Sequence, residues 1–355
     1  MNRVDLIDPV KDERWDSFVE NHPYGWIVHL SGWKRVLENS FPHMKGYYLA
    51  LTDDADCQVK AALPMFHIQS WLTGNRLVSI PFATLCDPLA VQPDHVEPLI
   101  AEAIRLSGRL NSKYLEIRTL HPSPLSEDGR LEESRLYKNH YLMLDRPLEG
   151  IQKSFHRQSI RHKIKRAEKS MLTLHVAGDE SCLREFYRLY VETRKRLGLP
   201  PQPYVFFRSL WDVFHSGRRV RLLMAKRGET VIAGLMIFTF NGRCSTEYLG
   251  SDIACRDLSP DHFLYWQAIQ MAHREGFKIF DLGRTEASND TLMLFKSRWG
   301  TMVTDLPQYY YPRAVVNHAS HMETSYKYRL LREICRRAPE ALLHRIGNFC
   351  YRHSG

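Results

Sequence analysis

Two similar series of predicted helices and strands follow one another in this chain. This repetition restricts the possible folds more than any other feature of the sequence. Each series opens with helical segments, continues with a ladder of strands and a long late helix, and closes on a strand with a related signature. The first closes on KYLEIRTL (113–120) and the second on KIFDLGRT (278–285). Alternating elements of this kind form layered α/β structures. The sequence therefore predicts two tandem α/β domains with mixed sheets and a boundary near residue 150.

Hydrophobic periodicity places the elements of both series. In the first series, the predicted helices cover 15–21, 31–39 and 95–110, and the strands 46–51, 59–69, 77–80 and 113–120. In the second series, the predicted helices cover 151–170, 181–196 and 260–275, and a further helix ends at 215. The predicted strands of this series cover 172–177, 220–226, 231–240, 243–251 and 278–283. We expect domains at 1–150 and 151–312, and a separate tail at 313–355.

Length and composition fit this plan. A chain of 355 residues is long for one domain. The amino terminus has no signal-like apolar region, and no run of about 18 apolar residues occurs, so a cytoplasmic protein is expected. The seven cysteines are scattered and never spaced C-x-x-C, which argues against a zinc site or a disulfide framework. No metal and no cofactor are expected.

The net charge of +9 suggests an anionic partner such as RNA, a phospholipid surface or a phosphate-bearing substrate. A merely solvated basic surface is the alternative. The segment SFHRQSIRHKIKRAEKS (154–170) is strongly basic and has only Glu168 to oppose its cations. Such an imbalance is self-repelling unless an anion relieves it. The segment is therefore predicted to face a polyanion, with an exposed linker helix as the other interpretation.

Two further segments have the character of a binding site. In YVETRKRLGLPPQPYVFF (190–207), Arg194 and Tyr204 are predicted at the rim of a pocket, although Arg194 could equally cap the preceding helix. In TEYLGSDIACRDLSPDHFLYWQAI (246–269), Tyr248 ends a strand, and Ser259 and Pro260 begin a helix as N-cap and first residue. The free amides of that helix start would suit an anionic group or a polarised carbonyl.

Several motifs are missing. The chain has no G-x-x-x-x-G-K-[ST], G-x-G-x-x-G, G-x-S-x-G or H-E-x-x-H. These absences disfavour nucleotide hydrolysis, dehydrogenase and serine hydrolase functions. Also missing is the Arg-x-x-Gly-x-Gly/Ala turn by which ordinary acetyl-CoA-dependent N-acetyltransferases hold the pyrophosphate, which weakens acetyl-CoA as the donor.

An ordered set of segments resembles the Fem-type aminoacyltransferases, a family of the N-acetyltransferase-fold superfamily. The segments are HLSGWKRVL, SIRHKIKRAEK, YVETRKRLG, LSPDHFLYWQAIQMAHREGFKIFDLGRT and LMLFKSRWGT, and the resemblance runs from about residue 15 to 311. It implies two tandem N-acetyltransferase-like domains, the second catalytic. The best-known members move an amino acid from aminoacyl-tRNA onto the peptide of a lipid-linked peptidoglycan precursor.

The resemblance also implies roles for individual residues. Phe295 and Lys296 match a Phe-Lys pair beside the scissile ester, and Lys34 matches a lysine that contacts the precursor phosphates. Arg194, Tyr204 and Tyr248 fall near positions lining the acceptor channel. A lysine cation packed against Phe295 could stabilise the oxyanion of acyl transfer, and Asp281 or Asp257 could serve as general base. A solvent-exposed strand lysine is the alternative for Lys296.

Together these features predict an acyl- or aminoacyltransferase that acts on an amine of a peptidoglycan precursor or an exopolysaccharide. The donor stays open between aminoacyl-tRNA and acyl-CoA, because the long coiled-coil hairpin of several tRNA-using members is missing and the chain is closer to shorter Fem-like proteins of cell-envelope gene clusters. The alternative is a non-catalytic protein that keeps the fold and binds RNA or phospholipid.

The tail is predicted to be basic, amphipathic and helical. Its apolar side chains recur at helical spacing: Leu331, Ile334, Ala338, Leu342, Ile346 and Phe349. Its cations fall mostly on other faces of the helix: Lys327, Arg329, Arg332, Arg336, Arg337, Arg345 and Arg352. Residues 331–338 are expected to cover the catalytic domain's own core. Residues 342–349 are expected to lie on an anionic membrane, which would make the protein peripheral at the inner membrane face.

Overall fold

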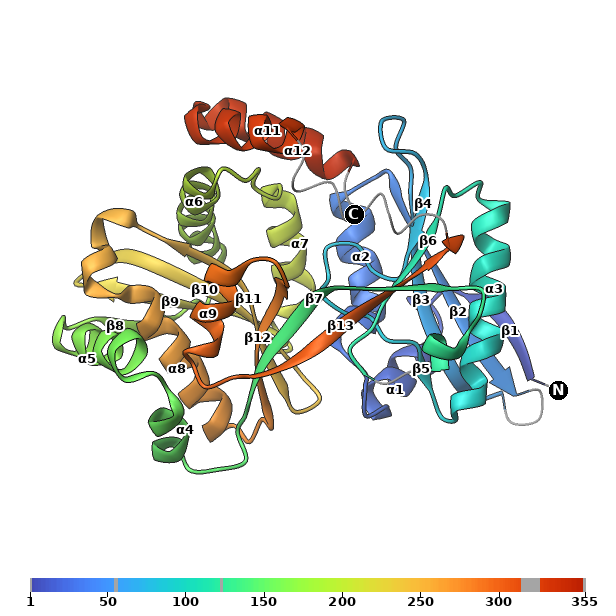
Figure 1. Cartoon of the computed structure of the whole chain (residues 1–355), viewed down its shortest axis with the longest axis horizontal. Coiled ribbons are helices and arrows are strands. Elements are labelled where there is room, and N and C mark those ends of the chain that lie inside the picture. Colours follow the sequence, from blue (N-terminus) through green and yellow to red (C-terminus); the bar gives the residue numbers. More distant parts are fainter. Residues whose placement is uncertain (1, 54–56, 122–123, 314–325, 354–355) are drawn as a thin grey trace. The chain divides into compact units, whose positions relative to one another are not determined.

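A computed structural model describes residues 2–53, 57–121, 124–313 and 326–353 (Figure 1). The chain divides into two compact units. Unit 1 contains residues 1–137, 305–328 and 348–355, and unit 2 contains residues 138–304 and 329–347. The chain passes from one unit to the other four times, within strands β7 (Glu132–Met143) and β13 (Met302–Tyr311) and within helices α11 (Tyr326–Arg337) and α12 (Glu340–His353).

Unit 1 is a mixed sheet with helices on both faces. Its strands lie in the order β1-β2-β3-β4-β6-β13, with the short β5 beside β3. The strands are β1 (Asn2–Ile7), β2 (Met44–Asp53), β3 (Val59–Ile68), β4 (Arg76–Val78), β5 (Leu89–Ala90) and β6 (Leu115–Arg118). Helix α3 (Val96–Arg109) packs on the face that carries Leu49 and Leu51. Tyr48 points to the opposite face, where it meets Trp15 of α1 (Glu13–Asn21), and α2 (Ser31–Ser40) also contacts β2.

Unit 2 has the same kind of architecture. Its strands follow the order β7-β12-β11-β10-β9-β8. They are β8 (Thr173–Val176), β9 (Val220–Arg227), β10 (Thr230–Phe240), β11 (Arg243–Ser251) and β12 (Ile279–Glu286). Helices α4 (Leu148–Ser154), α5 (His162–Lys169) and α8 (Pro260–Arg274) share one hydrophobic core with the sheet. Helices α6 (Glu180–Leu197) and α7 (Tyr204–Phe214) pack separately against β9, β10 and β11 (Figure 1).

Each unit contains a parallel strand pair as well as antiparallel ones. In unit 1, β4 runs parallel to β6, and in unit 2, β11 runs parallel to β12. In both, a helix on the connecting segment joins the parallel strands: α3 in unit 1 and α8 in unit 2. The predicted α/β class with mixed sheets is therefore confirmed. The domain limits at 150 and 312 stay a prediction.

The prediction of one continuous helix over 151–170 is wrong. The structure has α4, an extended link at Phe155 and His156, a π-helical turn at Arg157–Arg161, and then α5. Phe155 is fully buried between Trp266 and Trp299, which are 5.7 and 5.2 Å away between ring centroids. The His156 ring accepts a hydrogen bond from the amide of Ser159 and starts the next segment. Core packing thus outweighs local helix propensity here.

The tail is helical in the part that the structure describes. It consists of α11 (Tyr326–Arg337) and α12 (Glu340–His353), and residues 314–325 lie outside the described residues. Cys335, Ala338 and Leu343 are buried, whereas Ile334, Leu342 and Phe349 are 44–50% exposed. Burial at 335–338 agrees with the expected core contact of the first segment. Across the described ranges, no helix is both long and apolar enough to span a membrane.

Candidate active site

Lys296 is a buried helical residue. It lies near the end of α9 (Asp290–Ser297), a helix that Asn289 caps by accepting a hydrogen bond from the amide of Leu292. The side chain is only 6% exposed, and Nζ donates to the carbonyl oxygens of Gly283 and Arg284 at 2.8 and 2.9 Å. The alternative interpretation of Lys296 as a solvent-exposed strand residue is therefore wrong.

Phe295 points elsewhere. Its ring lies edge-on to His262 and Tyr265 of α8, with centroid separations of 6.0 and 6.4 Å. Successive helical residues face different directions. The expectation that packing against Phe295 holds the Lys296 cation is therefore replaced by another arrangement, in which backbone carbonyls hold the cation and Phe295 packs on α8.

The charge of the Lys296 amine interacts with those of two carboxylates, Asp281 and Glu247. Asp281 on β12 is 2% exposed, accepts a hydrogen bond from the amide of Gly283, and lies 3.4 Å from the guanidinium of Arg243. These contacts make Asp281 a structural carboxylate. Asp257, the other predicted general base, is an exposed residue of the short 3-10 helix η5 (Ile253–Leu258).

Glu247 on β11 is the acidic residue that sequence reasoning missed. Met236 pairs with Tyr248 and Ile237 with Thr246, so Glu247 is the extra residue of a β-bulge. The β11–β12 ladder covers only residues 243–245 of β11, so Glu247 lies where the two parallel strands have stopped pairing. Ser245 donates a hydrogen bond to its carboxylate. A carboxylate on the strand TEYLG (246–250) was the available sequence signal.

The pKa values of Lys296 and Glu247 are shifted toward each other. Burial lowers the pKa of Lys296 to about 8, although the charges of Asp281 and Glu247 act in the opposite direction. Burial raises the pKa of Glu247 to about 7. Burial and, to a lesser degree, the Lys296 charge lower the pKa of the nearby His140 to about 4. Near neutral pH the cluster therefore contains a protonated lysine, a carboxyl able to exchange its proton, and a neutral imidazole.

Three of the predicted acceptor residues lie in unit 2, with Arg194 on α6, Tyr204 on α7 and Tyr248 on β11. Tyr248 packs against Tyr190 and Phe207, and its hydroxyl lies 3.5 Å from the side-chain nitrogen of Gln202. Arg194 donates twice to the carbonyl of Pro200, at 3.1 and 3.0 Å, so it closes the end of α6 as the capping interpretation expected. Tyr204 donates to Glu180 at 3.1 Å.

Lys34 belongs to unit 1. It lies on α2 and forms an ion pair of 2.8 Å with Glu38, one helical turn further on. Glu38 also accepts a hydrogen bond from the amide of Gly46. An anion that binds Lys34 would therefore have to share it with Glu38.

Unit 2 also contains a cavity of about 520 Å³. Its cations are Lys163 and Arg166 of α5, Arg196 of α6, and Arg256 of η5. The remaining lining consists of Ser251, Asp252, Ile253, Asp257, Ser259, Pro260, Asp261 and His262. The predicted polyanion-facing segment and the predicted anion-binding helix start thus line the same cavity. His262 links them to the catalytic candidates, because its ring contacts Phe295 and stacks on Trp299 at 5.8 Å.

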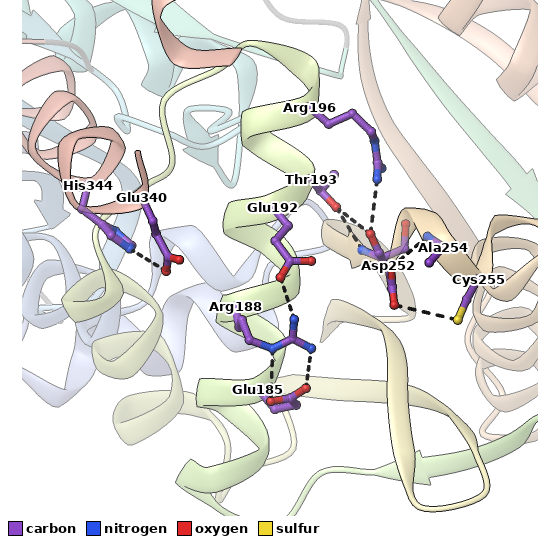
Figure 2. Close-up of polar contacts among 11 residues, drawn as sticks. Glu185, Arg188, Glu192, Thr193, Arg196, Asp252, Ala254, Cys255, Glu340 and His344 are labelled. Atoms are coloured by element: carbon purple, nitrogen blue, oxygen red, sulfur yellow. Dashed lines mark hydrogen bonds and ion pairs between the residues drawn. The ribbon is translucent and has the colours of Figure 1, made fainter. Parts of the chain in front are cut away.

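The cavity wall is fixed by contacts between α6 and the end of β11 (Figure 2). The Thr193 hydroxyl exchanges hydrogen bonds with the backbone of Ser251, at 3.0 and 3.3 Å. Arg196 donates to the Ser251 carbonyl, and Asp252 caps the following turn by accepting from the amide of Ala254. Ser259 is the N-cap of α8 and Pro260 its first residue, as predicted, although Ser259 has φ of +59° and its side chain forms no capping hydrogen bond.

Metal chemistry has no evident site in the described ranges. Within them, no group of three or more histidine, cysteine, aspartate or glutamate side chains could hold a metal ion.

Comparisons with known proteins agree with this architecture. The family described as "Acetyltransferase (GNAT) domain" matches residues 154–292. A UDP-N-acetylmuramoylpentapeptide-lysine N(6)-alanyltransferase of Weissella viridescens is 22% identical over 327 residues, covering 86% of this chain and 94% of the relative.

Solved structures show the same fold over nearly the whole chain. The crystal structure of FemX has a TM-score of 0.71 at 15% identity, covering 90% of this chain and 98% of FemX. The L-PGS structure from Bacillus licheniformis has a TM-score of 0.58 at 14% identity, covering 92% and 98%. A tandem GNAT protein from the clavulanic acid biosynthesis pathway has a TM-score of 0.55 at 12% identity, covering 87% and 98%.

The fold and the matching GNAT domain identify an acyltransferase of the GNAT superfamily. Within that superfamily, the chain is similar to the Fem-type enzymes through the Weissella alanyltransferase and FemX.

Proposed function

We propose that this protein transfers an aminoacyl group from a phosphate-bearing donor to an amine of a cell-envelope precursor, and that unit 2 contains the reacting groups. The observation that carries this proposal is the electrostatic interaction of the buried Lys296 with Glu247, whose pKa values are about 8 and about 7 respectively. Acyl transfer to an amine needs a base that deprotonates the amine and a cation that stabilises the oxyanion, and this pair can supply both.

The proposed reaction proceeds in two steps. Glu247 accepts a proton from the acceptor's ammonium group, and the neutral nitrogen then attacks the carbonyl carbon of the donor. A C–N bond forms while the carbonyl electron pair moves to oxygen. Lys296 has three N–H donors, of which two bind the carbonyls of Gly283 and Arg284, and we assign the third to this oxyanion. Collapse of the intermediate releases the donor's oxygen or sulfur, which takes up a proton, and leaves an amide.

The donor's phosphates are assigned to the cavity between α5 and the start of α8. Lys163, Arg166, Arg196 and Arg256 line it, and phosphate groups bind readily to such cations and to helix amides. Aminoacyl-tRNA and acyl-CoA share this chemistry. Arg256, Ser259 and Asp261 have the spacing of the acetyl-CoA turn, but a serine and an aspartate replace its glycine and its Gly/Ala. The carboxyl of Asp261 opposes a pyrophosphate, so aminoacyl-tRNA is the preferred donor.

The acceptor is assigned by chemistry and similarity. The Weissella relative is named as an alanyltransferase that acts on the lysine of UDP-N-acetylmuramoylpentapeptide. We therefore propose an amine of a peptidoglycan precursor as acceptor, with an amine of an exopolysaccharide as second choice. Tyr248, Arg194 and Tyr204 stay the candidates for holding the acceptor in unit 2. Lys34 stays the candidate for the precursor phosphates in unit 1.

A direct test is an assay of the purified protein with peptidoglycan precursors and either total charged tRNA or a mixture of acyl-CoAs. Mass spectrometry of the precursors reads out the product. We expect an added aminoacyl mass in the tRNA arm only. An acyl product in the CoA arm would reassign the donor. Binding of tRNA without any product in either arm would favour the alternative, a non-catalytic anion-binding protein.

A peripheral position at the inner membrane face would bring the site to a lipid-linked acceptor. In the tail, Leu342 and Phe349 are 46% and 50% exposed and lie seven residues apart on α12, which places them on one face of the helix. This exposure supports the predicted membrane contact of residues 342–349. Leu343, in contrast, is buried.

A further inference from the structure

Unit 1 has an exposed apolar surface that contains none of the residues assigned to acyl transfer. The loop between β3 and β4 carries Trp71 and Leu72, which are 78% and 53% exposed. Phe349, from the part of α12 that belongs to unit 1, is 50% exposed. We call Trp71, Leu72 and Phe349 the Trp71 surface. Exposed side chains of this size gathered in one place indicate an interaction site.

The Trp71 surface rests on a buried histidine. His353 is 5% exposed, and the rings of Trp71 and Phe349 both lie edge-on to it, 5.2 and 4.9 Å away between centroids. Its Nδ1 lies 2.9 Å from the hydroxyl of Ser70, and its carbonyl accepts hydrogen bonds from Thr73 and Arg76 at 3.0 and 2.9 Å. The loop and the helix end therefore present their apolar side chains from a hydrogen-bonded base.

The polar surroundings of the Trp71 surface are cationic. The backbone joins it to two further segments, because Gln69 donates to the carbonyl of His43 at 3.1 Å and Lys113 donates to the carbonyl of Asn75 at 2.7 Å. Four cations, Lys45, Arg76, Lys113 and Arg352, come from the segments that form and adjoin this surface, which are 42–45, 67–76, 110–114 and 348–353. These segments contain no aspartate and no glutamate. Lys45, Lys113 and Arg352 are exposed.

We propose that the Trp71 surface binds the face of an anionic phospholipid bilayer. Tryptophan, leucine and phenylalanine can enter the interfacial region, while the surrounding cations pair with lipid phosphates. Each such cation adds about 1 kcal/mol near an anionic membrane. A second copy of this chain fits less well, because its own cations would meet these. The inference adds a membrane-binding surface to the proposed function, and vesicle binding needs neither donor nor acceptor, so the two can fail separately.

The distribution of tryptophan gives a specific readout. Of the seven tryptophans, Trp15, Trp26, Trp33, Trp211, Trp266 and Trp299 are at most 8% exposed, and Trp71 alone is open to solvent. When the full-length protein is mixed with vesicles of phosphatidylglycerol and phosphatidylcholine, its emission should shift to the blue. Brominated lipid should quench it. The variant Trp71→Phe should keep binding but lose both signals.

Vesicle flotation tests the binding itself. The double variant W71A/L72S should lower the partition coefficient at least about tenfold, because two large apolar side chains no longer enter the membrane. The double variant K113E/R352E should lose binding to anionic vesicles in low salt. Val91→Ser is the matched control, since Val91 is a 60% exposed apolar residue of unit 1 outside this surface, and should bind like the parent.

Two results would overturn the inference. One is flotation of W71A/L72S equal to that of the parent. The other is lipid-independent self-association of the parent that W71A/L72S abolishes, because the surface would then bind a second copy. The W71A/L72S variant should keep full transfer to a water-soluble precursor, so that loss of vesicle binding is not confused with failure of the proposed reaction.

Discussion

The Nζ atom of Lys296 lies 2.8 Å from the carbonyl oxygen of Gly283, so the end of β12 orients the amine of the next helix. Gly283 has φ of +75°, a left-handed conformation that glycine adopts without strain. The amide of the same residue donates to Asp281. One glycine thus fixes both the proposed oxyanion-stabilising amine and a carboxylate that acts on its charge.

Gly283→Ala should lower transfer more than it lowers stability. A Cβ at this position meets only the Thr246 carbonyl, at 3.7 Å, so the main cost is backbone strain of about 1 kcal/mol. Rotation of the Gly283 carbonyl would release Lys296, and its pKa should rise from about 8 as it becomes more hydrated. A lower kcat, together with a shift to higher pH of the fall in rate on the alkaline side of the pH–rate profile, would support this role. An equally slow variant whose rate falls at the same pH as in the parent would contradict it.

The pH dependence of transfer follows from the two shifted groups. Glu247 must be ionised to accept a proton, so the rate should rise as pH increases through about 7. Lys296 must be protonated to stabilise the oxyanion, so the rate should fall as pH increases through about 8. The profile should be a narrow bell whose apparent pKa values belong to the coupled pair. Glu247→Gln should reduce the rate and remove the acidic limb, whereas Glu229→Gln, at an exposed hairpin turn, should leave the profile unchanged.

Charge removal in the cavity should weaken donor binding. Lys163→Ala and Arg166→Ala should each raise KM for the donor and reduce the salt dependence of binding, with kcat much less affected. Lys165→Ala and Lys169→Ala are the controls, because both are exposed cations of α5 that do not line the cavity. Equal effects of all four substitutions would mean that general basicity, rather than this cavity, attracts the donor.

Close backbone packing behind the site gives a stability prediction. A Cβ on Gly250 would lie 2.5 Å from the amide nitrogen of Tyr190, so β11 could not approach α6 as it does. Gly250→Ala should therefore destabilise the fold by about 1–3 kcal/mol, measured by denaturant unfolding. Gly217→Ala, with open space around its Cβ, should stay within about 1 kcal/mol of the parent. A neutral Gly250→Ala would show that this contact is looser than described.

Periodicity predicted most of the strands and long helices, because their apolar patterns are long and regular. It missed α9, because DTLMLFKS is short and its apolar residues are mostly only half-buried. Strand β13 was also missed, since its first residues are exposed and its remainder pairs with β6, far away in sequence.

The candidate site was predictable only in part. Lys296 and Phe295 were assigned from a resemblance, and no pattern in the residues around them indicated that backbone carbonyls would hold the amine. Glu247 was missed because its importance depends on a bulge and on the end of strand pairing, both of which are tertiary features. The cavity joins α5, α6 and α8, and its basic residues were recognised separately without evidence that they meet.

The central claim is that Lys296 stabilises the transition state of transfer, and single-turnover kinetics with charged tRNA and a peptidoglycan precursor test it most directly. Lys296→Met should reduce the rate of transfer by at least about 100-fold while donor binding and the folded state, checked by circular dichroism, stay intact. Lys278→Met, an exposed lysine just before β12, should transfer at the parent rate. A folded Lys296→Met variant that transfers as fast as the parent would contradict the assignment.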